Sequence, residues 1–158
     1  MKNNTKILRS ELQKELDALS KINADFSEAV KLTPIDNFSR RDLRIVGSIF
    51  HDFYTYIEKA FKKIATHIDE ELPKETAWQS NSLDRMALRV ADLRPAVISN
   101  DLKNDLYDFL RFRHVVRNVY GFELDLKKVL PLIDSFADTY HKVKEELNQF
   151  MIWLKEMD

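Results

Sequence analysis

Apolar residues recur every three or four positions along most of this chain, which is the spacing of an amphipathic α-helix. The pattern is clearest in two long stretches, from about Asn4 to Leu32 and from about Ser39 to Glu71. No stretch of the sequence shows the strict alternation of apolar and polar residues that a half-buried β-strand requires. The sequence therefore predicts an all-α fold.

Helix-breaking residues are few and widely spaced. Proline interrupts a helix interior because it lacks the N–H donor and its ring clashes with the preceding turn. Four prolines divide the chain into five segments of helical character: Pro34, Pro73, Pro95 and Pro131. Beside the two long stretches, they predict a short helix over residues 82–93, a fourth helix from about residue 99 to Gly121, and a fifth that starts at Pro131.

Length, charge and cysteine content narrow the class of protein. A chain of 158 residues fits one domain. We expect residues 1–158 to fold as an antiparallel four-helix-type bundle with one additional short helix. The sequence contains no cysteine, which excludes a disulfide scaffold, a thiolate zinc site and a cysteine nucleophile. A net charge of −1 argues against binding of duplex nucleic acid over a broad surface.

Targeting and cofactor signals are also missing from the sequence. The segment MKNNTKILRSELQKEL lacks the apolar core of a signal peptide, and no apolar run approaches the length that spans a bilayer. We therefore expect a cytoplasmic protein that does not bind membranes. The four histidines lack metal-ligand spacing, and there is no glycine-rich phosphate loop or GxSxG elbow. We expect neither a metal nor a cofactor.

The fourth predicted helix carries charge where a core helix needs apolar side chains. On a helical wheel of residues 102–120, one arc holds most of the large apolar residues: Leu102, Leu106, Phe109, Leu110, Val116 and Tyr120. Arg113 and Arg117 fall in the same arc, His114 lies on its edge, and Asn118 follows one turn later. Arginine is almost never fully buried without a partner, so these two guanidiniums need an explanation.

Two interpretations of these arginines remain open. In the structural interpretation, they form ion pairs with carboxylates of the second helix, such as Glu58 or Asp52, or extend to an edge of the bundle. In the functional interpretation, the arc lines a cleft or a subunit interface where arginine binds phosphate. The density of basic residues in this segment, together with a histidine that can move protons near neutral pH, favours the functional interpretation.

The segment RFRHVVRNVYGFELD, residues 111–125, resembles the signature helix of HEPN domains, and most of all that of HepT-like toxins. The segment GSIFHDFYTYIEKAFKKIATHIDEELPKETAW, residues 47–78, resembles the second helix and the following loop of such proteins. The resemblance extends from about residue 40 to residue 135. It implies an all-α homodimer that cleaves RNA as a metal-independent endoribonuclease, with a minimal nucleotidyltransferase as its antitoxin partner.

The family motif places an arginine several residues before a histidine, and a tyrosine two residues after that histidine. In this chain the arginine is Arg113, the histidine position holds Asn118, and the tyrosine is Tyr120. The polar position after the arginine, often asparagine in the family, holds His114. Because residues 114 and 118 are i and i+4 neighbours on one helix face, the imidazole still reaches nearly the same space.

The resemblance implies a role for each of these residues. Arg113, His114 and Asn118 would form the catalytic group, in which His114 acts as acid and base for attack by the RNA's own 2′-hydroxyl. Arg111 and Arg117, together with Arg113, would bind RNA phosphate. One His114 per subunit would supply both an acid and a base across the dimer.

Further residues surround this predicted site. Tyr120 matches the tyrosine that the nucleotidyltransferase of the family modifies with AMP, a change that would block the cleft. On the second helix, His51, Tyr54 and Glu58 are three or four residues apart, and we expect them to support the site across the cleft. Two alternatives remain: a non-catalytic module that binds a nucleotide or serves as the substrate-binding subunit of the nucleotidyltransferase, and a structural dimer with internal salt bridges.

Overall fold

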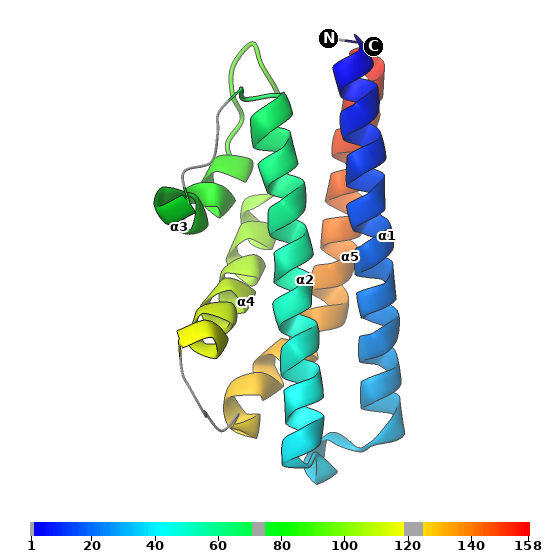
Figure 1. Cartoon of the computed structure of the whole chain (residues 1–158), viewed down its shortest axis with the longest axis vertical. Helices are drawn as coiled ribbons and strands as arrows, with labels where there is room; N and C mark the ends of the chain where they lie inside the picture. The colour runs from blue at the N-terminus through cyan, green and yellow to red at the C-terminus, as the bar shows by residue number, and fades with distance from the viewer. Residues whose placement is uncertain (1, 71–74, 119–124) are drawn as a thin grey trace.

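The computed structural model describes residues 2–70, 75–118 and 125–158. The helices are α1 (Lys2–Leu32), α2 (Arg40–His67), α3 (Glu75–Met86), α4 (Asn100–Asn118) and α5 (Leu126–Glu156), with a 3-10 turn, η1 (Ile35–Asn37), between α1 and α2 (Figure 1). Within these described ranges there is no β-strand, only an isolated bridge between Val90 and Arg94. The predicted all-α fold is confirmed.

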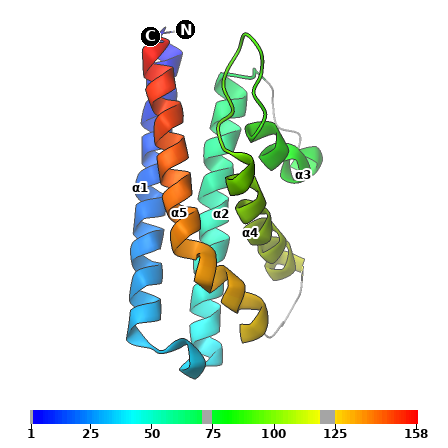
Figure 2. The same ribbon diagram turned by 180° about the vertical axis from the view of Figure 1, so that it is seen from behind.

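The four long helices form an antiparallel bundle. Helices α1, α2 and α5 run side by side along the length of the molecule, and α4 packs against α2 and α5 (Figure 2). The short helix α3 lies outside the bundle, against α2 and α4 (Figure 1). The prediction of a four-helix-type bundle with one additional short helix is therefore confirmed. No helix in the described part of the chain combines the length and the apolarity needed to cross a bilayer.

An aromatic cluster joins the four long helices. Phe26 of α1 lies with its ring centroid 4.3 Å from that of Phe136 of α5. Phe53 of α2 lies 4.9 Å from the same Phe136 ring, and Phe50 lies 5.5 Å from Phe109 of α4 with an edge-to-face geometry. Aromatic pairs at such distances add about 0.5–1.5 kcal/mol beyond the burial of their surface. The cluster therefore fixes how α2 and α4 pack, and with them the predicted site.

Helix α5 begins earlier than the sequence predicted. It starts at Leu126 rather than at Pro131 because Asp125 caps its N-terminus: the carboxylate accepts a hydrogen bond from the backbone N–H of Lys127 at 3.0 Å. Pro131 therefore lies inside the helix, where it removes one backbone donor. The first turns of α5 veer away from the axis of its remainder (Figure 2), as proline in a helix usually causes.

The short helix also lies elsewhere than predicted. It spans Glu75–Met86 instead of residues 82–93. The chain turns back after Met86, whose carbonyl accepts hydrogen bonds from the N–H groups of Val97 and Ile98 at 2.8 and 3.2 Å. A second turn falls at Asp92, which has a φ of 61°, a left-handed conformation that aspartate tolerates better than most residues.

A buried ion pair holds this turn against the bundle. Arg94, whose side chain is fully buried, donates from Nε to Oδ1 of Asp69 at 2.6 Å and from Nη2 to Oδ2 at 3.0 Å. Arg94 also donates from Nη1 to the carbonyl of Leu88 at 2.9 Å, and Arg85 donates to Asp69 at 3.0 Å. This pair, which has no local signal in the sequence, ties the loop after α3 to the end of α2.

Candidate functional site

Arg113 and Glu58 form an ion pair between α4 and α2. Nη1 of Arg113 lies 2.5 Å from Oε2 of Glu58, and both side chains are nearly buried, with 9% and 7% of their surface exposed. The second carboxylate oxygen, Oε1, lies 3.2 Å from Nζ of Lys62, one turn further along α2. The two oxygens of Glu58 are therefore held by two different cations, one from each helix.

Local sequence explains this arrangement. Tyr54, Glu58 and Lys62 follow one another at four-residue intervals, so they share one face of α2. Arg113 belongs to the buried arc of α4, and its long side chain leans toward the N-terminus of that helix. A buried guanidinium is tolerated only with a well-placed carboxylate. Arg113 thus has one of the two carboxylate partners named by the structural interpretation, Glu58, whereas the other, Asp52, lies beside His51, 3.6 Å from its Nδ1.

The ring of Tyr54 packs against the guanidinium of Arg113. The Cζ atom of Arg113 lies 5.6 Å from the centroid of the Tyr54 ring, a cation–π geometry. Burial raises the pKa of Tyr54 and the carboxylate of Glu58 raises it further, so the phenol stays neutral. Its hydroxyl and that of Ser82 on α3 are both buried, and neither forms a hydrogen bond with another described residue. Ser82 nonetheless lies near enough to oppose the rise in the pKa of Tyr54.

The other predicted residues of α4 lie at the surface or beyond the described side chains. His114 is exposed, and Arg111 has 73% of its side chain exposed and lies 3.4 Å from Oδ1 of Asp108. The backbone of α4 continues through Arg117 and Asn118, but their side chains are outside the described residues. So is the whole of Tyr120, and with it the predicted helix end at Gly121.

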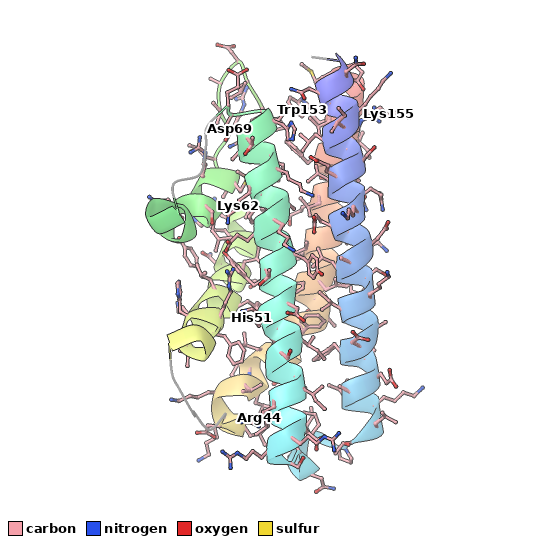
Figure 3. The ribbon with its side chains drawn as sticks, viewed as in Figure 1. Arg44, His51, Lys62, Asp69, Trp153 and Lys155 are labelled. Carbon is pink, nitrogen blue, oxygen red and sulfur yellow. The ribbon has the colours of Figure 1, made fainter. Side chains whose placement is uncertain are left out.

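One edge of α2 carries several polar residues. Figure 3 shows Arg44, His51 and Lys62 along this helix and Asp69 just beyond its C-terminal end. His51 is partly exposed, and its side chain pairs with Asp52 rather than with Arg113. The structure therefore brings Tyr54, Glu58 and Arg113 into contact, whereas His51 is not part of this cluster.

Sequence reasoning missed two members of this cluster. Lys62 follows Glu58 at i+4, a spacing typical of helical ion pairs, so a search for such pairs would have found it. Ser82 carries no comparable signal, because it reaches Tyr54 only through the packing of α3 on α2. Among the described residues, no group of three potential metal ligands lies close enough to hold an ion.

Two grooves lie away from the candidate site. One, of about 510 Å³, lies between the end of α1 and the start of α2 and contains Asp25, Glu28 and Ile45. The other, of about 590 Å³, lies between α1 and α5 and contains Arg9 and Lys155. Neither is lined by a residue predicted to be catalytic, so the candidate site rests on the α2–α4 cluster alone.

Comparison with known proteins identifies the family. A model of the HepT-like protein family matches residues 45–154, which is more than two thirds of the chain and includes all the described members of the α2–α4 cluster. Searches of the curated proteins and of the solved structures found no match. The family match agrees with the resemblance in residues 111–125 and with the all-α bundle. The chain therefore belongs to the HepT-like family of HEPN-domain proteins, a family related to toxin–antitoxin systems.

Proposed function

We propose that this protein is the toxin of a toxin–antitoxin pair and cleaves RNA as a metal-independent endoribonuclease. Membership of the HepT-like family supports the toxin role. The observation that supports the nuclease role is that an arginine held in place by its neighbours is followed directly by an exposed histidine. Glu58 and Tyr54 hold Arg113, and the next residue, His114, stands exposed on α4.

The proposed reaction is a transesterification within the RNA. The 2′-oxygen forms a bond to phosphorus, the bond from phosphorus to the 5′-oxygen breaks, and the products end in a 2′,3′-cyclic phosphate and a 5′-hydroxyl. His114 of one subunit accepts the proton of the 2′-hydroxyl, and His114 of the partner subunit donates a proton to the 5′-oxygen. Arg111, Arg113 and Arg117 stabilise the charge on the phosphate. Asn118 orients a neighbouring group in a cleft between the two subunits of a homodimer.

Control by the antitoxin follows from the same site. A partner nucleotidyltransferase transfers AMP to Tyr120, two residues after Asn118. An AMP group there adds negative charge and bulk beside the arginines, which excludes RNA phosphate by repulsion and by size. The family match supports a toxin–antitoxin setting for the chain. The choice of Tyr120 rests on the resemblance of residues 111–125 to the signature helix of the family.

RNA cleavage by the purified protein in EDTA tests this proposal. We expect wild type to cleave and Arg113→Ala to fail, and we expect His114→Ala to lose about 10²–10⁴ in rate, the usual contribution of a general acid or base. His141→Ala is the matched control, because His141 is an exposed histidine on α5. Circular dichroism checks that each variant is folded. Equal cleavage by wild type and His114→Ala would exclude His114 from catalysis.

A non-catalytic module is the second candidate function. The specific observation in its favour is that Glu58 neutralises Arg113 and that both side chains are nearly buried, as in a structural ion pair. In that case the protein binds a nucleotide or serves as the substrate-binding subunit of the nucleotidyltransferase. Expression of the chain alone in bacteria separates the two functions, because only a nuclease toxin slows growth.

A further inference from the structure

The carboxylate of Glu58 is bound as a small anion would be. Its Oε2 atom lies 2.5 Å from Nη1 of Arg113, and its Oε1 atom lies 3.2 Å from Nζ of Lys62. The two cations come from different helices and converge on one group. One carboxylate between two cations leaves the three side chains with a net charge of +1.

We infer that Arg113 and Lys62 form a phosphate-binding site and that Glu58 occupies it in the free protein. The inference rests on the proposed function, since the phosphate it would take is the phosphodiester of RNA. Carboxylates and phosphates offer a guanidinium the same feature, two oxygens on one centre that accept parallel hydrogen bonds. Glu58 is therefore an internal competitor of the substrate.

The surroundings of the site fit an exchange of one anion for another. Lys62 has 44% of its side chain exposed, so the cluster reaches solvent at this residue, which lies on the side of α2 that faces α3 (Figure 3). The guanidinium of Arg113 is also held by its contact with the ring of Tyr54. Glu58 lies on the same helix as Lys62, one turn away, and a change of side-chain rotamer moves its carboxylate toward this exposed position. The cations stay in place while their anion is replaced.

Two buried hydroxyls, those of Tyr54 and Ser82, also lie in this part of the structure. They lie close to each other, but neither forms a well-aligned hydrogen bond within the described part of the chain. Buried hydroxyls normally find well-placed partners. A phosphate has more oxygens than the single carboxylate of Glu58, so it offers the hydroxyl of Tyr54 a better acceptor than the free protein does.

Thermal unfolding in inorganic phosphate tests the site without RNA. We expect Glu58→Gln to unfold at a lower temperature than wild type in chloride, because the charge of Arg113 loses its partner. Phosphate at constant ionic strength then raises its midpoint in a saturable way, as any ligand of the native state does. We expect its phosphate affinity to exceed that of wild type at least tenfold, because the competing carboxylate is gone.

Glu15→Gln is the matched control. Glu15 of α1 is a glutamate with only 6% of its side chain exposed, and its carboxylate pairs with Lys63 of α2 at 2.8 Å. Its replacement also removes a buried carboxylate but leaves no arginine without a partner. We expect phosphate to raise the midpoint of Glu15→Gln no more than that of wild type. An equal rise in both variants would mean that phosphate stabilises the fold unspecifically, and the inference would be wrong.

Glu58→Asp covers the case in which Glu58→Gln does not fold. The shorter side chain keeps the charge but withdraws the carboxylate from Arg113, so it competes less well and phosphate binds more tightly than to wild type. If neither variant binds phosphate better than wild type, no phosphate site is formed by Arg113 and Lys62. Phosphate binding without RNA cleavage would remove the nuclease proposal and keep the site, and cleavage without phosphate binding would do the reverse.

Discussion

Two hydrogen bonds join the guanidinium of Arg94 to the carboxylate of Asp69, at 2.6 Å from Nε and 3.0 Å from Nη2. The pair connects the loop after α3 to the end of α2. It thereby sets where α3 lies and where Ser82 approaches Tyr54. Although it is distant in sequence from the residues proposed to be catalytic, this ion pair is part of what builds the candidate site.

Arg94→Ala should lower the stability of the protein strongly. The change leaves the buried carboxylate of Asp69 with only Arg85 as an ion-pair partner in the described structure. Breaking a buried ion pair from one side costs about 3–5 kcal/mol. Urea denaturation followed by circular dichroism measures the loss. Arg89→Ala in the same loop is the control, because Arg89 is exposed and its removal should change stability by no more than about 0.5 kcal/mol.

Stability should also depend on pH through Asp69. Burial by itself raises the pKa of this carboxyl, but hydrogen bonds from Arg94 and Arg85 outweigh it and hold the pKa below the ordinary value of 3.8. A group with a lowered folded pKa contributes its full stability above the unfolded value and loses it as the pH falls through the folded value. The stability difference between wild type and Asp69→Asn should therefore be constant above about pH 5 and shrink below 3.8. A difference that stays constant down to pH 2 would contradict the lowered pKa.

Phe136→Ala should destabilise the whole bundle. Phe136 is fully buried and contacts aromatic rings from all three other long helices, among them Phe26, Phe53 and Phe109. Replacement of a buried phenylalanine by alanine costs about 3–5 kcal/mol, because it removes apolar contacts and leaves a cavity. The midpoint of urea unfolding measures the effect. Ile152→Ala on the same helix is the control, since Ile152 is 58% exposed and should lose little.

Tyr120 should be the residue that accepts AMP. Incubation of the wild-type protein with its nucleotidyltransferase partner and ATP should add one AMP group, which mass spectrometry detects, and should abolish RNA cleavage. Tyr120→Phe should remain unmodified and active. Tyr107→Phe is the control, because the hydroxyl of Tyr107 on α4 already donates to Asp84 at 3.0 Å and should not be modified. If Tyr107→Phe, rather than Tyr120→Phe, abolished the modification, Tyr107 would be the residue that accepts AMP.

The sequence predicted the helices well and their limits less well. Periodic apolar residues identify the buried face of α2 because each turn of a helix repeats the pattern locally. The predicted start of α5 at Pro131 was wrong. Near an N-terminus capped by Asp125, the loss of one backbone hydrogen-bond donor costs less free energy than the additional helical residues contribute. The limits of α3 depend on Arg94 and Asp69, which lie on either side of that helix in the sequence, and no local pattern contains such a pair.

The candidate site was predictable in part. The conflict between Arg113 and its apolar arc is visible in the sequence, because it needs only the geometry of one helix. Glu58 was one of two possible partners of Arg113, and the choice between Glu58 and Asp52 depends on the point along α2 at which α4 crosses it. The aromatic cluster of Phe50, Phe53 and Phe109 sets that crossing point.

The sequence by itself determined that this chain is helical, which faces of its helices are buried, and that a guanidinium lies among apolar side chains on α4. These properties follow from the spacing of residues along one helix. Only the tertiary structure decided that Arg113 and Lys62 share the carboxylate of Glu58 and that Arg94 binds Asp69. Ion-pair partners depend on which side chains the packing of separate helices brings within a few ångströms, and periodicity carries no information about that distance.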